Sequence, residues 1–199
     1  MAARTKNLQR FFDCAQLAIK ARVAPASDAS RASELIFSEI GLSRPNEARR
    51  DCARLPSCAH FDAAAGLAQQ GPSDIAAVAA ALAQIEPELV WYNRKGSSPA
   101  FAAKHANAMI VGPNGLETHD HVQIGVSLMA PDTVYPDHQH VPEEVYLVLS
   151  SGDWRQNAGA WHEPAIGGIV YNPPNIVHGM RSRTSPLLAI WCLRAEPAA

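Results

Sequence analysis

The stretch YPDHQHVPEEVYLV, residues 135–148, brings together side chains that commonly bind metal ions. His138 and His140 are two residues apart, and Glu144 and Tyr146 follow at even steps. Because successive side chains of an extended strand point to opposite faces, all four are expected on one face. A carboxylate buried among apolar strands is unfavourable unless it is paired or coordinated. Imidazole and carboxylate groups are suitable ligands for Zn, Fe, Mn, Co or Ni, so this face is predicted to hold one divalent metal ion.

The residues of opposite parity in the same stretch are apolar. Val145, Leu147 and Leu149 are therefore expected on the other face, buried outside the sheet that carries the ligands. A second segment, GGIVYNPPNIVHGM at residues 167–180, ends one strand in a Pro-Pro-Asn turn and begins another near His178. That histidine lies far along the chain but could face inward as another ligand.

The elements that would position these side chains change in character after Pro87. From there, short runs rich in valine, isoleucine, tyrosine and tryptophan alternate with glycine, proline and asparagine. The runs cover residues 89–93, 107–112, 121–131, 144–150, 153–157, 167–174, 176–182 and 187–194. About eight short strands at this spacing predict an antiparallel sandwich or barrel.

Helices are predicted before Pro87, where apolar residues recur at three- and four-residue steps. They cover residues 8–22, 27–41 and 71–87. Ser27 or Asp28 is expected to cap the second helix, and Ser73 the third. The expected fold is mainly β, with a helical portion at residues 1–88 packed on a barrel at residues 89–199, in one compact unit.

Composition narrows the classes of function. Of the 199 residues, 47% are hydrophobic and 18% are charged, which favours a folded core, and the net charge of −2 gives no general reason to bind nucleic acid or anionic membranes. No apolar run is long enough to span a bilayer, and no Sec signal precedes the first helix. The four cysteines form no CxxC pair. A cytoplasmic protein, monomeric or homodimeric, with no nucleic-acid or membrane partner is expected.

The two ligand-bearing segments resemble the paired motifs of the cupin superfamily. The first motif is matched by His138, His140 and Glu144, and the second by Gly167, the Pro173-Pro174-Asn175 turn and His178. Asp132 and Asn175 stand where these motifs usually have glycine, and asparagine tolerates the positive φ that the turn needs. The resemblance implies a small antiparallel barrel, the double-stranded β-helix, with a metal ion in its mouth.

Together, YPDHQHVPEEVY and NPPNIVHGMRS resemble the cupin-type dimethylsulfoniopropionate (DMSP) lyases, in particular the DddQ type. This resemblance implies β-elimination of DMSP to dimethyl sulfide and acrylate. It implies His140, Glu144 and His178 as core metal ligands and Tyr146 as a catalytic base that can also contact the metal. His138 is implied as a fourth ligand or as a polar contact to the substrate. Tyr135 is implied in substrate positioning or proton handling.

The residue types suit this reaction. Elimination removes a weakly acidic proton next to a carboxylate, and a bound metal can stabilise the charge that develops. Tyrosine has an ordinary pKa of about 10, and a neighbouring divalent metal favours its phenolate. The neutral sulfide leaves without a strong general acid. Aromatic faces attract the sulfonium, and the candidates are Trp91, Tyr92, Trp154, Trp161, Tyr171 and Trp191.

Other interpretations remain open at this stage. A second HxH pair, His119 and His121, lacks a carboxylate at a suitable step and is expected to be only polar residues at the start of a strand. The same ligand set also serves other cupin enzymes, such as dioxygenases and sugar isomerases. A non-catalytic ligand-binding cupin is a further alternative, but such proteins often lose ligands that this chain keeps.

Overall fold

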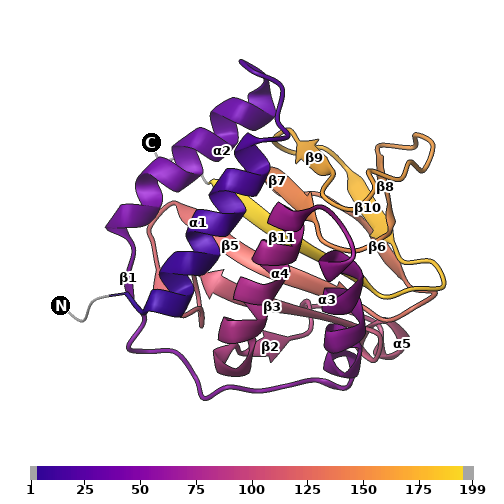
Figure 1. The fold of residues 1–199 in the computed structure, drawn as a ribbon. Helices are drawn as coiled ribbons and strands as arrows, with labels where there is room; N and C mark the ends of the chain where they lie inside the picture. The colour runs from indigo at the N-terminus through magenta and orange to yellow at the C-terminus, as the bar shows by residue number, and fades with distance from the viewer. Residues whose placement is uncertain (1–3, 195–199) are drawn as a thin grey trace.

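The computed structural model describes residues 4–194, which form a layer of helices against a curved, two-sheet β structure (Figure 1). The helices are α1 (Lys6–Lys20), α2 (Asp28–Glu39), α3 (Phe61–Gln69), α4 (Ser73–Ile85) and α5 (Pro99–Ala102). Short 3-10 turns follow or precede them at η1 (Ile40–Leu42), η2 (Pro56–His60) and η3 (Glu86–Glu88).

The strands form a larger and a smaller sheet. They are β1 (Arg44–Pro45), β2 (Trp91–Tyr92), β3 (His105–Val111), β4 (Glu117–Thr118), β5 (Val122–Met129), β6 (Val134–His138), β7 (Glu143–Val148), β8 (Asp153–Gln156), β9 (Ile169–Asn172), β10 (His178–Arg181) and β11 (Leu187–Arg194). The larger sheet has the order β1-β4-β3-β5-β11-β7-β9, with β2 also paired to β3, and the smaller has the order β6-β10-β8. The strand pairs are antiparallel except for β3 with β4.

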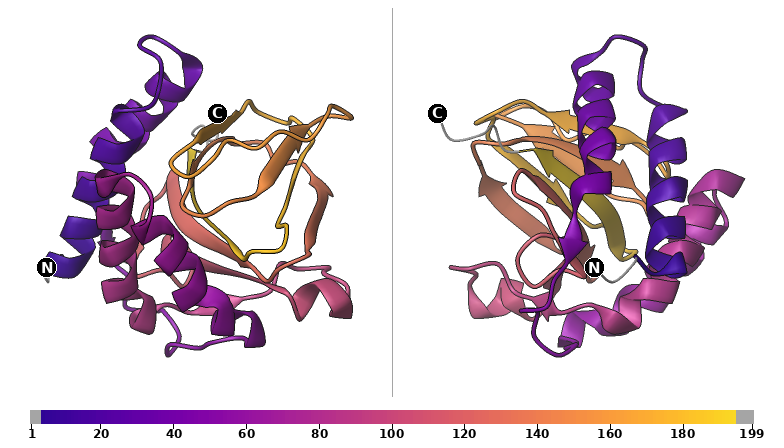
Figure 2. Two further views of the ribbon diagram at one scale, coloured as in Figure 1. Left: turned by 45° about the vertical axis from the view of Figure 1, so that its right-hand side comes forward. Right: turned by 90° about the vertical axis from the view of Figure 1, so that its left-hand side faces the viewer.

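The two faces of the larger sheet have different partners. Its outer face packs against α1–α4 in one continuous apolar core, to which β7 contributes Val145 and Leu147, with Leu149 just beyond the strand. Its inner face packs against the smaller sheet in a second core that contains Tyr135, Tyr146, Trp154, Met180 and Trp191. Figure 2 shows the strands of the two sheets curving toward each other, with α1–α4 on the outside of the larger sheet. The predicted parity of residues 144–149 is therefore confirmed.

The β-rich fold with helices packed outside it agrees with the sequence expectation. Ser27 is the N-cap of α2, and its side chain accepts a hydrogen bond from the Ser30 amide. The cap expected at Ser73 is wrong: Pro72 occupies the N-cap position, and Ser73 is the first residue of α4. The carbonyl of Pro72 already accepts the Ala76 amide, so the helix begins one residue earlier than expected.

Helix α3 and strand β6 lie outside the helical and strand runs predicted from the sequence, as do the short elements β1, β4 and α5. Helix α3 has the sequence FDAAAGLAQ, and its alanine content alone favours a helix. Strand β6 contains Pro136, which cannot donate to a β ladder and is tolerated because β6 lies at the edge of its sheet. This edge strand carries Tyr135 and His138, so it contributes directly to the candidate site.

The cysteines and the helix lengths indicate no particular function. Cys14, Cys52, Cys58 and Cys192 are all free thiols. Among residues 4–194, no helix has both the length and the apolar character needed to cross a bilayer.

Candidate metal centre and active site

Strand register brings the predicted site residues together from both sheets. On the larger sheet, Glu144 lies opposite Asn172, and Tyr146 lies opposite Trp191. On the smaller sheet, His178 lies opposite His138. His140 follows β6 in the connection to β7. His138 and His178, forty positions apart in the chain, are thus neighbours, and His178 faces Glu144 of the larger sheet.

Three imidazoles converge at this point. Ligand atoms of His138, His140 and His178 all lie within 4.8 Å of one another. Glu144 completes the group: its Oε2 lies 3.4 Å from His140 Nε2 and 3.3 Å from His178 Nε2. His140, Glu144 and His178, expected as core ligands, therefore lie together with His138, expected as a fourth ligand or a substrate contact.

The backbone fixes how these imidazoles face. Each Nδ1 lies near a carbonyl oxygen two residues away along the chain: His138 to Pro136 at 3.1 Å, His140 to Pro142 at 2.8 Å and His178 to Ile176 at 3.0 Å. A carbonyl oxygen can only accept, so Nδ1 carries the proton and the neutral ring keeps its lone pair on Nε2. This arrangement orients metal-ligating histidines in proteins generally.

Glu144 is held by a neutral polar chain. The residue is 3% exposed, and Oε2 accepts a hydrogen bond of 2.9 Å from the side-chain amide of Asn172. Gln156 in turn donates to Asn172 Oδ1 at 2.8 Å. Burial raises the pKa of the Glu144 carboxyl. When His140 and His178 are protonated, their hydrogen bonds and positive charge outweigh burial and bring that pKa to about 2. The carboxylate is thus stable only with positive charge beside it.

The donor set fits a divalent cation. His178 Nε2 is buried and has no hydrogen-bond partner among residues 4–194, although Glu144 Oε2 is 3.3 Å away. A buried polar atom without a partner is uncommon in folded proteins and calls for an explanation. Three nitrogen lone pairs and one carboxylate around a common point match the ligands of transition-metal sites, so the cluster is compatible with a metal ion.

Two tyrosines flank the cluster. Tyr146 and Tyr135 are 4% and 5% exposed, and the Tyr135 ring lies 4.6 Å from the His138 ring, centroid to centroid. Burial raises the pKa of Tyr146 well above its ordinary value, and the negative charge of Glu144 adds to this effect. Burial also raises the pKa of Tyr135, and the positive charge of Arg94 opposes that rise. Both hydroxyls are therefore held in their protonated form when no cation is nearby.

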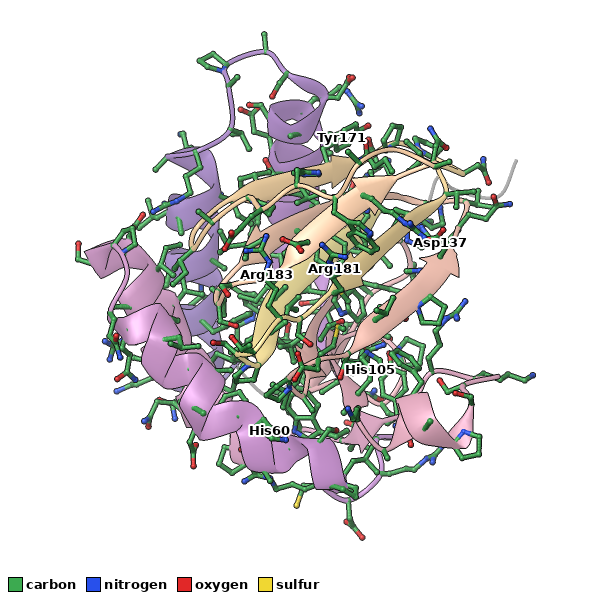
Figure 3. The ribbon with its side chains drawn as sticks, turned by 90° about the vertical axis from the view of Figure 1, so that its right-hand side faces the viewer. His60, His105, Asp137, Tyr171, Arg181 and Arg183 are labelled. Carbon is green, nitrogen blue, oxygen red and sulfur yellow. The ribbon has the colours of Figure 1, made fainter. Side chains whose placement is uncertain are left out.

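A cavity of about 280 Å³ opens onto this cluster. His138, His140, Glu144, Tyr146 and Tyr135 line it, together with Tyr92, Arg94, Lys95, Asn107, Met109, Gln123, Ser127, Gln139, Trp191 and Leu193. Of the aromatic residues proposed to attract a sulfonium, Tyr92 and Trp191 line the cavity. Trp91 packs in the outer core, and the Trp154 ring packs edge-on against Tyr146. Tyr171 faces the helices, beside which it is labelled in Figure 3.

Trp161 lies away from the cavity as well. The guanidinium carbons of Arg155 and Arg181 lie 4.5 and 4.6 Å from its ring centroid. Figure 3 views the smaller sheet from outside, and Arg181 and Asp137 lie on this outer face. The Trp161 ring thus contacts two arginines and is not part of the cavity lining.

The other sequence features behave as surface or turn residues. His119 Nδ1 accepts hydrogen bonds from the backbone amides of His121 and Val122, at 3.1 and 2.9 Å. The side chain therefore holds the backbone in the bend that leads into β5. Asp132 and Asn175, which replace the motif glycines, have φ values of 51° and 62°. These positions thus require the left-handed conformation, and aspartate and asparagine adopt it.

Several residues near the cluster follow no sequence pattern that predicts a role in the site. Asn172, which orients Glu144, follows a short apolar run and directly precedes Pro173; a polar residue at the end of a buried strand was the available signal. Asn107 accepts a hydrogen bond from Ser127 Oγ at 2.6 Å on the cavity wall. Arg94 comes from the loop after β2, where no periodicity applies.

Comparisons with known proteins agree with this geometry. The family model for dimethylsulfoniopropionate lyase matches residues 29–189. DddL of Cereibacter sphaeroides, a protein assigned as a DMSP lyase, is 32% identical over 124 residues, which are 62% of this chain and 52% of DddL. The chain thus spans about half the length of that relative.

Solved structures give the same picture of the fold. DddQ, a DMSP lyase from Ruegeria pomeroyi DSS-3, matches with a TM-score of 0.69 and 19% identity, over 98% of this chain and 95% of that one. A crystal structure from work on the DMSP lyases RdDddP and RnDddQII matches with the same score and identity, over 95% and 92%. The shared fold confirms the cupin-type architecture expected from the two motifs.

Proposed function

Because the chain belongs to the DMSP lyase family, we propose that it cleaves DMSP by β-elimination to dimethyl sulfide and acrylate. The observation that carries this proposal is the cluster of three backbone-oriented imidazoles around the buried Glu144, open to a small cavity with two tyrosines. Membership in the family suggests DMSP as the substrate. The cluster is a site where a bound metal ion could activate the carboxylate of DMSP.

The proposed ligands are His140, Glu144 and His178, with His138 as a fourth ligand or a substrate contact. A divalent cation held there would polarise the substrate carboxylate, stabilise charge that develops on it and favour the phenolate of Tyr146. Zn, Fe, Mn, Co and Ni all suit these donors, and availability decides among them.

Tyr146 is proposed as the base. Its hydroxyl lies on the inner face beside Glu144 and can also contact the cation. The phenolate removes the proton from the carbon next to the carboxylate, the electron pair forms the carbon–carbon double bond, and the carbon–sulfur bond breaks. Dimethyl sulfide leaves as a neutral molecule, so no acid is needed, and Tyr146 later returns its proton to solvent. Tyr135, against His138, is proposed to position the substrate or handle that proton.

The sulfonium end is proposed to bind beside Trp191 and Tyr92. An aromatic face attracts such a cation by about 0.5–2 kcal/mol. Gly125 lies opposite Trp191 on β5, and a side chain there would collide with the indole ring. The missing side chain lets the indole lie against the strand and leaves room for a small ligand.

The decisive experiment measures dimethyl sulfide in the headspace above purified, metal-loaded protein given DMSP under nitrogen. We expect release without oxygen, as an elimination requires; strict dependence on oxygen would instead indicate an oxygenase. His178→Ala should lower metal content and turnover together. Full metal occupancy in that variant would remove His178 from the ligand set.

A further inference from the structure

Arg94 stands out among the cavity residues because no carboxylate within residues 4–194 pairs with its charge. It is half-buried, lines the cavity, and its guanidinium carbon lies 5.8 Å from the centroid of the Tyr135 ring. Within residues 4–194, its side chain makes no hydrogen bond and no ion pair. Most other arginines of the chain do pair with carboxylates, as Arg4 does with Glu117 and Arg22 with Asp74.

The loop that carries Arg94 is fixed from both sides. The preceding side chain, Asn93, donates to the carbonyls of Ala102 and His105 at 2.9 and 2.8 Å. The carbonyl of Arg94 itself accepts the amide and the hydroxyl of Ser97, at 3.2 and 2.7 Å. The backbone at Arg94 is therefore held in place, which lowers the entropy lost when its side chain binds a ligand.

The charges around the cavity define what Arg94 could bind. Lys95 adds a second positive charge to the lining, and the acidic group of the lining, Glu144, is directed to the histidines. A guanidinium presents a planar fork of N–H donors that matches the two oxygens of a carboxylate. A half-buried fork of this kind facing a small polar cavity suits a carboxylate ligand.

We propose that Arg94 binds the carboxylate of the substrate, next to Tyr135 and on the side of the cavity that carries the histidine cluster. This rests on the proposed function, which makes the substrate a zwitterion with a carboxylate at one end and a sulfonium at the other. Arg94 attracts the first end and repels the second, so it sets the direction in which the molecule enters. The same charge weakens the binding of sulfonium compounds that lack a carboxylate.

The test uses calorimetric titration of metal-loaded protein with two probes at constant ionic strength. Acrylate carries the carboxylate without the sulfonium, and trimethylsulfonium carries the reverse. We expect Arg94→Gln to weaken acrylate binding about tenfold or more and to tighten trimethylsulfonium binding. Arg94→Lys, which keeps the charge but loses the fork, should recover only part of the affinity. With DMSP, the main effect of Arg94→Gln should be a higher KM.

Arg10→Gln is the matched control, because it removes the same charge from the exposed surface of α1, in the helical layer. Equal acrylate affinity in wild type and Arg94→Gln would overturn the proposal. So would an equal loss in Arg10→Gln, or a wild-type protein that does not bind acrylate. If acrylate binding depends on Arg94 but wild type releases no dimethyl sulfide, the carboxylate site stands and the proposed function fails.

Discussion

Glu143 and Glu144 are neighbours on β7, both nearly fully buried, and they face opposite sides of the larger sheet. Glu143 faces the helices, where the guanidinium of Arg31 on α2 lies 3.0 Å from Oε2 and the hydroxyl of Tyr171 donates at 2.8 Å. Arginine keeps its proton at any physiological pH. The Glu143 carboxylate is therefore charge-balanced by the chain itself.

Glu144 has the same carboxylate group, but it has different neighbouring side chains. It faces the smaller sheet, where its neighbours are His140, His178 and the neutral amide of Asn172. Imidazoles supply positive charge only when they are protonated, whereas their Nε2 lone pairs point toward a common centre. Glu144 is thus hydrogen-bonded but lacks a permanent cation, and a bound metal ion would supply one.

Asp153 on β8, in the smaller sheet, is a third buried carboxylate, and like Glu143 it is paired with arginine. Asp153 is fully buried, and Arg181 and Arg183 bind its two oxygens at 2.7 and 2.6 Å. Both arginines are labelled in Figure 3. These arginines lower the pKa of the Asp153 carboxyl despite its burial, which acts in the opposite direction. Burial alone therefore does not mark a functional carboxylate. The identity of its partners does.

The largest expected difference comes from matched substitutions of the two glutamates. Glu144→Gln should lower metal affinity at least about 100-fold and abolish turnover, because a charged ligand becomes neutral. Glu143→Gln should leave metal affinity and turnover within about threefold of wild type. Metal content by mass spectrometry and dimethyl sulfide release would measure both.

Chelation provides the control for these two variants. A ligand that binds only the folded state stabilises it, by about 2.7 kcal/mol at 100 times its Kd. A chelator should therefore lower the Tm of wild type and Glu143→Gln, and leave that of Glu144→Gln nearly unchanged. Equal metal loss in both glutamate variants would break the comparison between the two faces.

A second matched pair separates chemistry from binding. Tyr146 and Tyr171 are also on opposite faces, the first in the cavity and the second bonded to Glu143. Tyr146→Phe should keep the metal and lose at least about 100-fold in turnover, since the base is removed. Tyr171→Phe should keep both. Wild-type turnover in Tyr146→Phe would exclude that residue as the base.

The sequence predicted this division where strand periodicity applies. Parity along β7 separated Glu144 and Tyr146 from Val145 and Leu147, because each sheet face has a different apolar core. The two motifs identified His178 across forty residues. The β-rich fold followed from the spacing of short apolar runs.

The remaining residues of the site depend on contacts that no local pattern encodes. Arg94 reaches the cavity from a loop, and Asn172 reaches Glu144 through pairing between β7 and β9. Strand pairing is a long-range property, so the partner of a given residue cannot be read from its neighbours in sequence. The prediction that Ser73 caps α4 was wrong by one residue. Pro72 occupies the N-cap position, because the fixed φ of proline suits the residue at which a helix begins.

The neutral support of Glu144 should matter less than the glutamate itself. Asn172→Ala removes the amide that orients Oε2, and residues of this kind typically change metal affinity about 10- to 100-fold. We expect weaker metal binding with a proportional loss of turnover at low metal concentration, and recovery of turnover when excess metal is added. Failure of excess metal to restore turnover would indicate that Asn172 acts on the substrate instead.

The smallest effect is expected from the support of Glu143. The side chain of Arg31 is 51% exposed, so solvent screens its ion pair, and such pairs contribute about 0–1 kcal/mol. Arg31→Gln should lower the free energy of unfolding by less than about 1 kcal/mol in urea titration, because Tyr171 still donates to the carboxylate. Metal affinity should not change, since Glu143 faces away from the histidines. A change in metal affinity as large as that in Asn172→Ala would mean that the two faces of β7 are coupled, and the separation between a structural and a functional carboxylate would no longer hold.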